Sequence, residues 1–152
     1  MKKHFSFEAI MNMEKQKRVH FINSLGGFKS VSLLGTVNKQ GQTNLAIFSS
    51  VFHIKANPSL IALIFRPSPP ERNIFRNIID TEFYTINHLN ENIYKQAHQT
   101  SARYDSDISE FDVTGLQPEF KNNFKAPLLQ KAAFNLEWNL RNKLTLRSTI
   151  PL

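Results

Sequence analysis

The sequence predicts a single domain, residues 1–152, that is mainly β and forms a small antiparallel barrel with peripheral helices. Its length is about that of one domain. The segments that favour strands are grouped early and late in the chain with short helical segments between them, unlike the regular alternation of a parallel sheet. Hydrophobic residues make up 41% of the chain and include 13 Phe, so there is enough apolar surface to bury a core.

The N-terminal third is predicted to contain one helix and a β-hairpin. Apolar residues between positions 5 and 16 follow a helical spacing, and Ser6 is available as the N-cap. Two apolar stretches, residues 29–38 and 43–54, flank a polar connection that contains Gly41. Because glycine adopts a positive φ that other residues resist, we expect these stretches to pair as antiparallel strands.

The middle of the chain is predicted to combine strands with short helices. Residues 60–65 form an uninterrupted apolar run between two prolines, which favours a strand buried on both faces in the middle of a sheet. The pattern predicts a helix over residues 71–79 and a strand over residues 82–88. A further helix is expected over residues 90–99, with Asn90 as its cap.

The last third is predicted to be a long loop followed by strand structure. Residues 101–130 are rich in Ser, Asp, Asn, Gly and Pro, and they favour only a short turn at residues 109–111. A loop of this length is usually functional. Apolar and polar residues then alternate over residues 134–146, which predicts one bent strand or two short ones.

Positive charge is concentrated in one stretch of the chain. The net charge is +7, and residues 15–70 contain no Asp or Glu. This stretch is expected to attract an anion, and its scattered cations suit a small phosphorylated ligand better than nucleic acid, for which no binding motif is present. Alternatively, these are surface residues that happen to lack acidic neighbours. The basic residues are Lys15, Lys17, Arg18, Lys29, Lys39, Lys55 and Arg66.

Several classes of site are excluded or unsupported. The chain has no Cys, so disulfides, thiol nucleophiles and cysteine metal sites are excluded. The five His lie on different predicted elements, and no motif of a dinucleotide fold, a phosphate loop or a zinc protease is present. No apolar run approaches the roughly 20 residues of a membrane span, and no signal peptide is evident. We therefore expect a cytoplasmic protein with no metal and no membrane partner.

The residues best suited to hold an anion lie between positions 44 and 66. Asn44, Ser49 and Ser50 place short hydrogen-bonding side chains on a predicted strand. Arg66 follows the buried run with a planar, permanently charged group suited to phosphate. The alternative is that the serines only satisfy backbone groups and that Arg66 extends into solvent.

A set of short segments adds a resemblance to a known family. In order and spacing, over about residues 18–140, these segments resemble the flavin reductase-like family, which has the FMN-binding split barrel. The segments are Phe21–Leu25, Thr43–His53, Asn57–Pro58, Phe65–Pro67, Tyr84–Asn87, Gln96–Tyr104, Ser109–Phe111 and Gly115–Leu116.

The resemblance implies a fold, a cofactor and an activity. The fold is an antiparallel split β-barrel, usually a homodimer, with FMN held non-covalently near the subunit interface. The activity is hydride transfer from NADH or NADPH through the flavin to a free flavin or another small electron acceptor, with a separate oxygenase component as a possible partner. Such chemistry requires no nucleophile from the protein, since the reactive atoms belong to the cofactor.

The resemblance also implies which residues contact the flavin. Arg66 matches a residue near the phosphate, and Arg72 and Asn77 match a Lys-x-Thr-x-x-Asn phosphate element. His98 and Thr100 lie in the segment that approaches the flavin ring or the pocket beside it. The strand expected to lie along the flavin contributes Asn44, Leu45, Ala46, Phe48, Ser49 and Ser50.

The chain departs from the family pattern at several positions. Ile74 stands where the phosphate-binding Thr is common, which removes a hydroxyl donor and predicts weaker retention of FMN. Ile47 replaces a common Pro, and His53 replaces a frequent Asn. Family members continue beyond the position of Leu152 with a further strand, so an unpaired sheet edge is expected here.

Two functions other than a reductase stay open at this point. A flavin-binding or flavin-storage protein without turnover is compatible with the same site and with the short C-terminus. A basic barrel that binds nucleic acid is compatible with the charge distribution. Bound flavin and its reduction by NADH distinguish the three.

Overall fold

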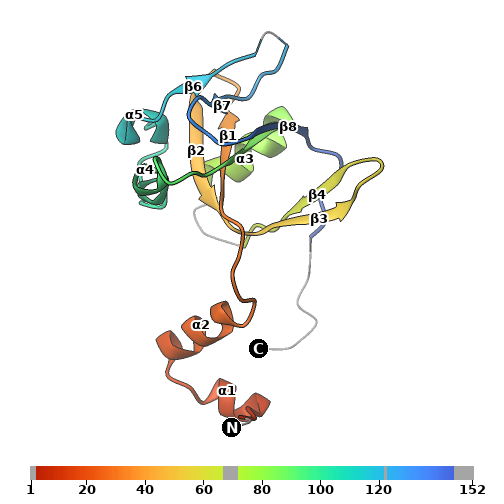
Figure 1. The fold of residues 1–152 in the computed structure, drawn as a ribbon, viewed down its shortest axis with the longest axis vertical. Helices are drawn as coiled ribbons and strands as arrows, with labels where there is room; N and C mark the ends of the chain where they lie inside the picture. The colour runs from red at the N-terminus through yellow and green to blue at the C-terminus, as the bar shows by residue number, and fades with distance from the viewer. Residues whose placement is uncertain (1–2, 67–71, 122, 146–152) are drawn as a thin grey trace. The chain divides into compact units, whose positions relative to one another are not determined.

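The computed structural model describes residues 3–66, 72–121 and 123–145. The chain separates into two compact units, Met1–Ser30 and Val31–Leu152, and each is described by itself (Figure 1). That one domain extends over the whole chain stays a prediction. Within the described ranges, no helix has the length and apolar character needed to cross a membrane.

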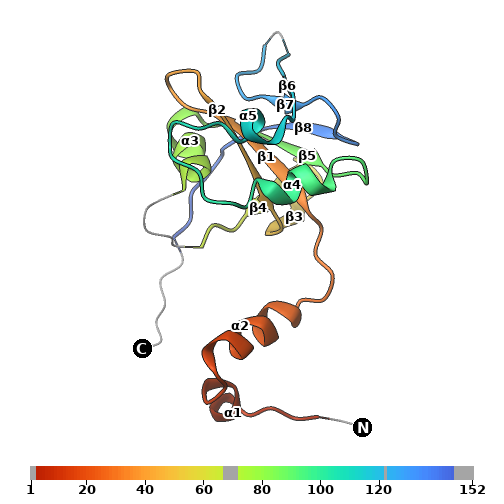
Figure 2. The same ribbon diagram turned by 90° about the vertical axis from the view of Figure 1, so that its left-hand side faces the viewer.

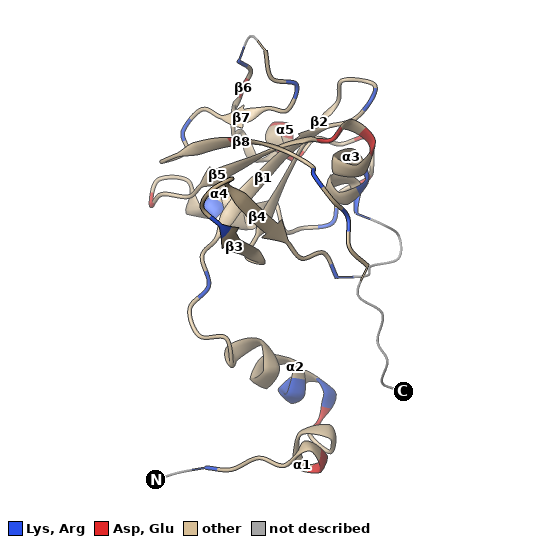
Figure 3. Cartoon of the chain, turned by 90° about the vertical axis from the view of Figure 1, so that its right-hand side faces the viewer, with Lys and Arg blue, Asp and Glu red and all other residues tan. Residues whose placement is uncertain are grey.

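The N-terminal unit contains two short helices, α1 (Phe7–Met11) and α2 (Lys15–Ser24). Ser6 caps α1 as predicted, because its hydroxyl accepts a hydrogen bond from a backbone N–H of the first turn at 3.1 Å. The helix predicted over residues 5–16 is wrong in extent: the chain breaks after α1, and the carboxylate of Glu14 caps a second helix. Lys and Arg, blue in Figure 3, gather on the first turns of α2.

The second unit is built around a four-stranded antiparallel sheet with the order β2-β1-β5-β8. The predicted hairpin is confirmed, since β1 and β2 pair along their length and Gly41 between them has a φ of 88°. The late strand is shorter than predicted, and Leu146 lies outside the described residues. The strands are β1 (Ser32–Val37), β2 (Thr43–Phe48), β5 (Phe83–His88) and β8 (Asn135–Asn139).

Two predicted strands differ from the structure. The strand predicted over residues 43–54 is interrupted, because β2 ends at Phe48 and two serines turn the chain into β3 (Val51–Lys55). The apolar run 60–65 forms β4 (Leu60–Leu63), which pairs only with β3 among the described strands. The prediction of a strand in the middle of a sheet is therefore wrong. β4 is only half-buried, because it belongs to a two-stranded ribbon that packs on the core from one side.

Short helices and a second two-stranded sheet complete the described part of this unit. Helix α3 agrees with the prediction to within two residues. Helix α4 begins later than predicted, because the Asn90 side chain accepts a hydrogen bond from Asn92 in a turn and caps no helix. Helix α5 extends the turn predicted inside the long loop. The elements are α3 (Asn73–Thr81), α4 (Tyr94–Gln99), α5 (Glu110–Thr114), β6 (Pro118–Glu119) and β7 (Leu128–Leu129).

Apolar side chains cover both faces of the central sheet. Leu33 and Leu34 are neighbours on β1, so they point to opposite faces, and each belongs to a different buried cluster. Helices α4 and α5 contribute to the cluster around Leu33, whereas α3 contributes Ile74 and Ile78 to the other (Figures 1 and 2). The mainly β, antiparallel fold with peripheral helices is thus confirmed. The described strands form separate sheets and do not close into one ring.

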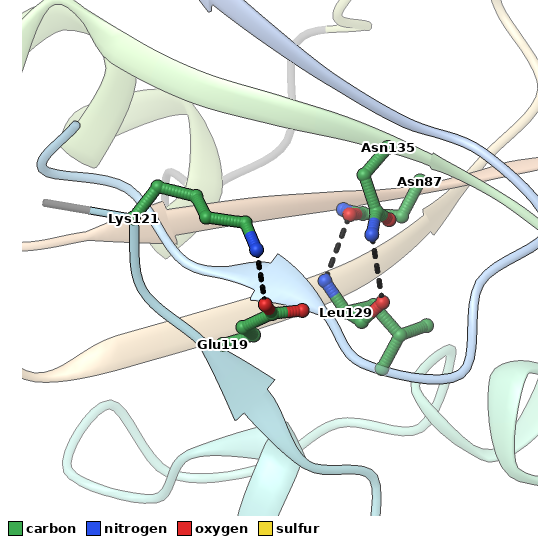
Figure 4. Close-up of polar contacts among 5 residues, drawn as sticks. All are labelled: Asn87, Glu119, Lys121, Leu129 and Asn135. Carbon is green, nitrogen blue, oxygen red and sulfur yellow. Dashed lines mark hydrogen bonds and ion pairs between the residues drawn. The ribbon is translucent and has the colours of Figure 1, made fainter. Parts of the chain in front are cut away.

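A buried polar network joins β5 to the segment that covers it. Asn87 accepts a hydrogen bond from the backbone N–H of Leu129 at 2.9 Å (Figure 4) and donates one to the backbone oxygen of Leu33 at 3.0 Å. Gly35 lies on the neighbouring strand. A β-carbon there would collide with the backbone oxygen of Pro127 and the hydroxyl of Thr85. The close packing of residues 127–129 against this part of the sheet therefore depends on the side-chain amide of Asn87 and on the absence of a side chain at Gly35.

Candidate functional site

A small cavity lies where β2 ends, β4 ends and α3 begins. Its volume is about 100 Å³. It brings together five of the predicted binding residues, which come from three separate segments: Phe48, Ser49, Ser50, Arg66 and Arg72. Ile47, Ile64 and Phe65 complete the lining.

The breaks between secondary-structure elements place these polar side chains. β2 ends at Phe48, so the two serines occupy the turn to β3 instead of continuing a strand. The backbone N–H of Ile64 donates to the backbone oxygen of Ser50 at 3.1 Å, which holds the end of β4 beside this turn. Arg66 follows shortly afterwards, and Arg72 immediately precedes α3. Four polar residues from three separate segments thus meet at one place.

The cavity combines an apolar wall with positive charge. The rings of Phe48 and Phe65 lie 4.9 Å apart, and Phe75 of α3 packs behind Phe65 at 5.1 Å. Within the described residues, neither Arg66 nor Arg72 takes part in an ion pair. Guanidinium groups and hydroxyls are groups that bind phosphate through charge-assisted hydrogen bonds. The volume of about 100 Å³ is well below the roughly 300–1,000 Å³ of a complete small-molecule pocket, so the cavity has room for only part of such a ligand.

Asn44 and Asn77 line a different and larger cavity. This cavity has a volume of about 480 Å³ and is bordered by the β1–β2 connection, α3 and residues 106–108. Asn77 is buried, and its side chain donates to the hydroxyl of Thr36 at 3.1 Å. The side chain of Asn44 donates to Glu110 at 2.6 Å. The structure therefore does not bring these two amides together with the serines and arginines.

The remaining predicted residues line neither cavity. Leu45 is fully buried in the core, and Ala46 is half-buried beside the α3 cluster. Thr100 is buried, and its hydroxyl donates to the backbone oxygen of Ala97 and accepts from the backbone N–H of Ile47. His98 is exposed near the end of α4. Whether any of them contacts a ligand stays a prediction.

Glu110 is a polar residue in contact with β2 to which the sequence analysis assigned no role. One carboxylate oxygen accepts from the backbone N–H of Leu45 at 3.0 Å and from the side chain of Asn44. Burial raises the pKa of Glu110, although these hydrogen bonds oppose the rise. In the sequence, Glu110 was part of the family-like segment Ser109–Phe111 and lay at the start of a short helix, which is ordinarily a solvated position, so neither signal indicated a contact with β2.

The raised pKa predicts how Glu110 affects stability. The pKa of Glu110 in the folded protein lies above the ordinary value of 4.5, so its contribution to the free energy of unfolding is complete below that pH and is lost as the pH rises through the folded pKa. Glu110→Gln is expected to gain stability relative to the wild type between about pH 4 and pH 7. Urea unfolding across this range measures the difference, and the exposed Glu91→Gln serves as a control. If the difference in free energy of unfolding between Glu110→Gln and the wild type does not change with pH, the prediction is contradicted.

Several solved structures share the fold of this chain. A protein from Shewanella frigidimarina NCIMB 400 that carries the name of a flavin reductase with a split barrel domain is 52% identical. The match has a TM-score of 0.89 and covers 95% of this chain and 72% of that chain. Nitrilotriacetate monooxygenase component B from Bacillus cereus is 20% identical, with a TM-score of 0.86 over 98% of this chain and 74% of that chain. The NADH:FAD oxidoreductase of Streptomyces globisporus C-1027 is 15% identical, with a TM-score of 0.67 over 86% and 74% of the two chains.

A curated relative and a family model also match this chain. A protein of Aquifex aeolicus (strain VF5), to which no function is assigned, is 25% identical over 114 residues, or 74% of this chain. The chain spans 58% of the length of that relative. The model described as "Flavin reductase like domain" matches residues 25–150 and so includes the whole of the small cavity. The chain therefore belongs to the flavin reductase-like family, with its split-barrel fold.

Proposed function

We propose that this chain binds FMN and transfers hydride from NADH or NADPH, through the flavin, to a free flavin or another small acceptor. The observation that carries the proposal is the small cavity, in which two hydroxyls and two guanidinium groups adjoin a wall of Phe side chains. Family membership supports a flavin and a reductase activity. The choice of FMN rests on the match between this cavity and a phosphate.

The residues present fit one end of FMN. Arg66 and Arg72 supply charge and hydrogen-bond donors for the phosphate, and Ser49 and Ser50 supply hydroxyls. Phe48 provides apolar surface suited to an aromatic ring. Bound FMN supplies a ring that accepts a hydride and passes on electrons, so the protein needs only to bind, orient and exclude water.

The small volume of the cavity supports the idea that a second protein surface contributes to flavin binding. A volume of about 100 Å³ holds a phosphate but leaves most of a flavin mononucleotide outside. We propose that a second copy of the chain, in a homodimer, covers the rest. A separate oxygenase component is a candidate recipient of the reduced flavin, because one structural neighbour is a monooxygenase component B. A cytoplasmic location stays a prediction from the sequence.

Titration of the purified protein with FMN tests the proposal directly. The proposed function predicts an altered flavin absorption spectrum, quenched flavin fluorescence and bleaching on addition of NADH or NADPH without oxygen. Riboflavin, which lacks the phosphate, is expected to bind at least about tenfold more weakly because it cannot contact the two Arg side chains. Binding without bleaching indicates a flavin-storage protein, and no FMN binding by folded protein overturns the proposal.

Arg66→Ala and Arg72→Ala are expected to weaken FMN binding by about tenfold or more each. Each substitution removes a charge-assisted hydrogen-bond donor, which contributes about 1.5–3 kcal/mol. Binding should also become less sensitive to salt, because a screened charge interaction has been removed. Fluorescence titration at two ionic strengths measures both effects. Arg66→Lys is a further variant that keeps the charge but loses the planar fork, so intermediate affinity is expected.

The control for these variants is Arg103→Ala, which removes an exposed Arg that lines neither cavity. It should bind FMN as the wild type does. If all three alanine variants bind equally well, Arg66 and Arg72 do not contact the phosphate.

A further inference from the structure

Strand β2 lies at an edge of the four-stranded sheet, and side-chain oxygens from other segments accept hydrogen bonds from its outward backbone N–H groups. Its only strand partner among the described residues is β1. The backbone N–H of Leu45 instead donates to the carboxylate of Glu110 at 3.0 Å, and that of Ile47 donates to the hydroxyl of Thr100 at 2.9 Å. Without these acceptors, two N–H groups of the edge would lack the partners that buried or half-buried backbone groups require.

The start of helix α5 is joined to the beginning of β2 by further polar contacts. The oxygen of Glu110 that accepts from Leu45 also accepts from the Asn44 side chain at 2.6 Å. The hydroxyls of Ser109 and Thr43 lie 2.9 Å apart. Consecutive residues of β2 are therefore held by one end of a single short helix, and Glu110 makes two of these contacts.

Thr100 fixes the other end of the strand. Its hydroxyl donates to the backbone oxygen of Ala97 at 2.8 Å, which directs the oxygen lone pairs toward the N–H of Ile47. Thr100 is buried, so solvent does not compete for this contact. Ile47 and the next residue, Phe48, line the small cavity. The hydrogen bond of Thr100 thus acts on a residue of the cavity wall.

We propose that Glu110 and Thr100 are positioning residues for flavin binding, which hold β2 so that its last residues and the following serines shape the cavity. This inference rests on the proposed function. Neither residue lines the small cavity, so both act through the strand.

Paired substitutions test the inference through FMN affinity. Thr100→Val removes the acceptor and keeps the shape, and it is expected to weaken FMN binding by about tenfold. Thr100→Ser keeps the hydroxyl and should restore wild-type affinity. Glu110→Gln keeps an oxygen that can accept from Leu45 and Asn44 but loses the negative charge, so both hydrogen bonds to β2 lose their charge assistance. FMN should therefore bind several-fold more weakly, while the stability of the variant at neutral pH does not fall. Loss of affinity without loss of stability is not expected of a merely structural residue.

Two further measurements distinguish an effect on the position of β2 from a general loss of stability. Thr114→Val removes a buried hydroxyl at the end of α5 that bonds to the helix backbone and to the N–H of Leu116 but not to β2, so it should lower stability without changing FMN affinity. In the protein without flavin, hydrogen exchange of the Ile47 amide should accelerate in Thr100→Val and not in Thr100→Ser.

The outcomes distinguish the inference from the function on which it rests. If the wild type does not bind FMN, the proposed function fails and the positioning role fails with it. If the wild type binds FMN and the Thr100→Val and Glu110→Gln variants bind it equally well, only the positioning role is overturned. Equal weakening by Thr100→Val and Thr100→Ser also overturns it, because the hydroxyl is then not the active feature.

Discussion

Asn87→Leu is expected to lower the free energy of unfolding by about 2–5 kcal/mol. The substitution keeps a side chain of similar size but removes the acceptor for the N–H of Leu129 and the donor to the backbone oxygen of Leu33. Both backbone groups are buried, and each unsatisfied buried group costs about 1–3 kcal/mol. The contact of Asn87 with the Thr85 hydroxyl is lost as well. Urea unfolding followed by circular dichroism measures the change.

Asn135→Leu is the matched control for this experiment. Asn135 donates to the backbone oxygen of the same Leu129 at 3.1 Å (Figure 4), but it is exposed, so water can replace it. A loss below about 1 kcal/mol is expected for the control. Similar losses for Asn87→Leu and Asn135→Leu would show that burial of Asn87 does not determine its contribution.

Gly35→Ala is expected to destabilise the protein by about 3 kcal/mol, the upper end of the usual cost of overpacking. The added β-carbon meets the backbone oxygen of Pro127 and the hydroxyl of Thr85 at less than van der Waals separation. A backbone oxygen cannot move aside as a flexible side chain can, so the covering segment must shift away from β1. The same unfolding experiment measures the loss of stability.

Gly26→Ala is the control for the glycine substitution. The atoms nearest to a β-carbon at Gly26 belong to the end of the flexible Lys29 side chain, which can move at little cost. Its expected effect is within about 0.5 kcal/mol. An unchanged midpoint for Gly35→Ala would mean that the covering segment is not held close to the sheet.

The sequence predicted elements whose signal is local. The hairpin of β1 and β2 followed from two apolar stretches and Gly41, and the structure confirms the pairing and the positive φ. Ser6 was expected to cap the first helix, and it does. The burial of β4 was mispredicted, because an apolar run shows only that a segment prefers contact with other apolar groups. Which face is covered depends on the layers that other segments provide.

For the candidate site as well, the sequence predicted the residues of the small cavity but not every grouping of polar residues in space. The serines after β2 and the arginines near α3 were identified from residue type and resemblance, and the structure places them around one cavity. Asn44 and Asn77 were assigned to the same site, yet the fold directs them to another cavity. Glu110 was not identified, because its contact with Leu45 joins segments that are far apart in sequence.

The amino-acid sequence by itself determined the hairpin of β1 and β2, the turn at Gly41 and which chemical groups are available for an anion. These properties depend on backbone preferences and on side-chain chemistry, which each residue carries regardless of its distant neighbours. Only the tertiary structure decided which polar groups share a cavity and which carboxylate closes the edge of β2. Those outcomes depend on pairs of residues that meet when the sheet and its covering helices pack together, since hydrogen bonds act only over about 3 Å.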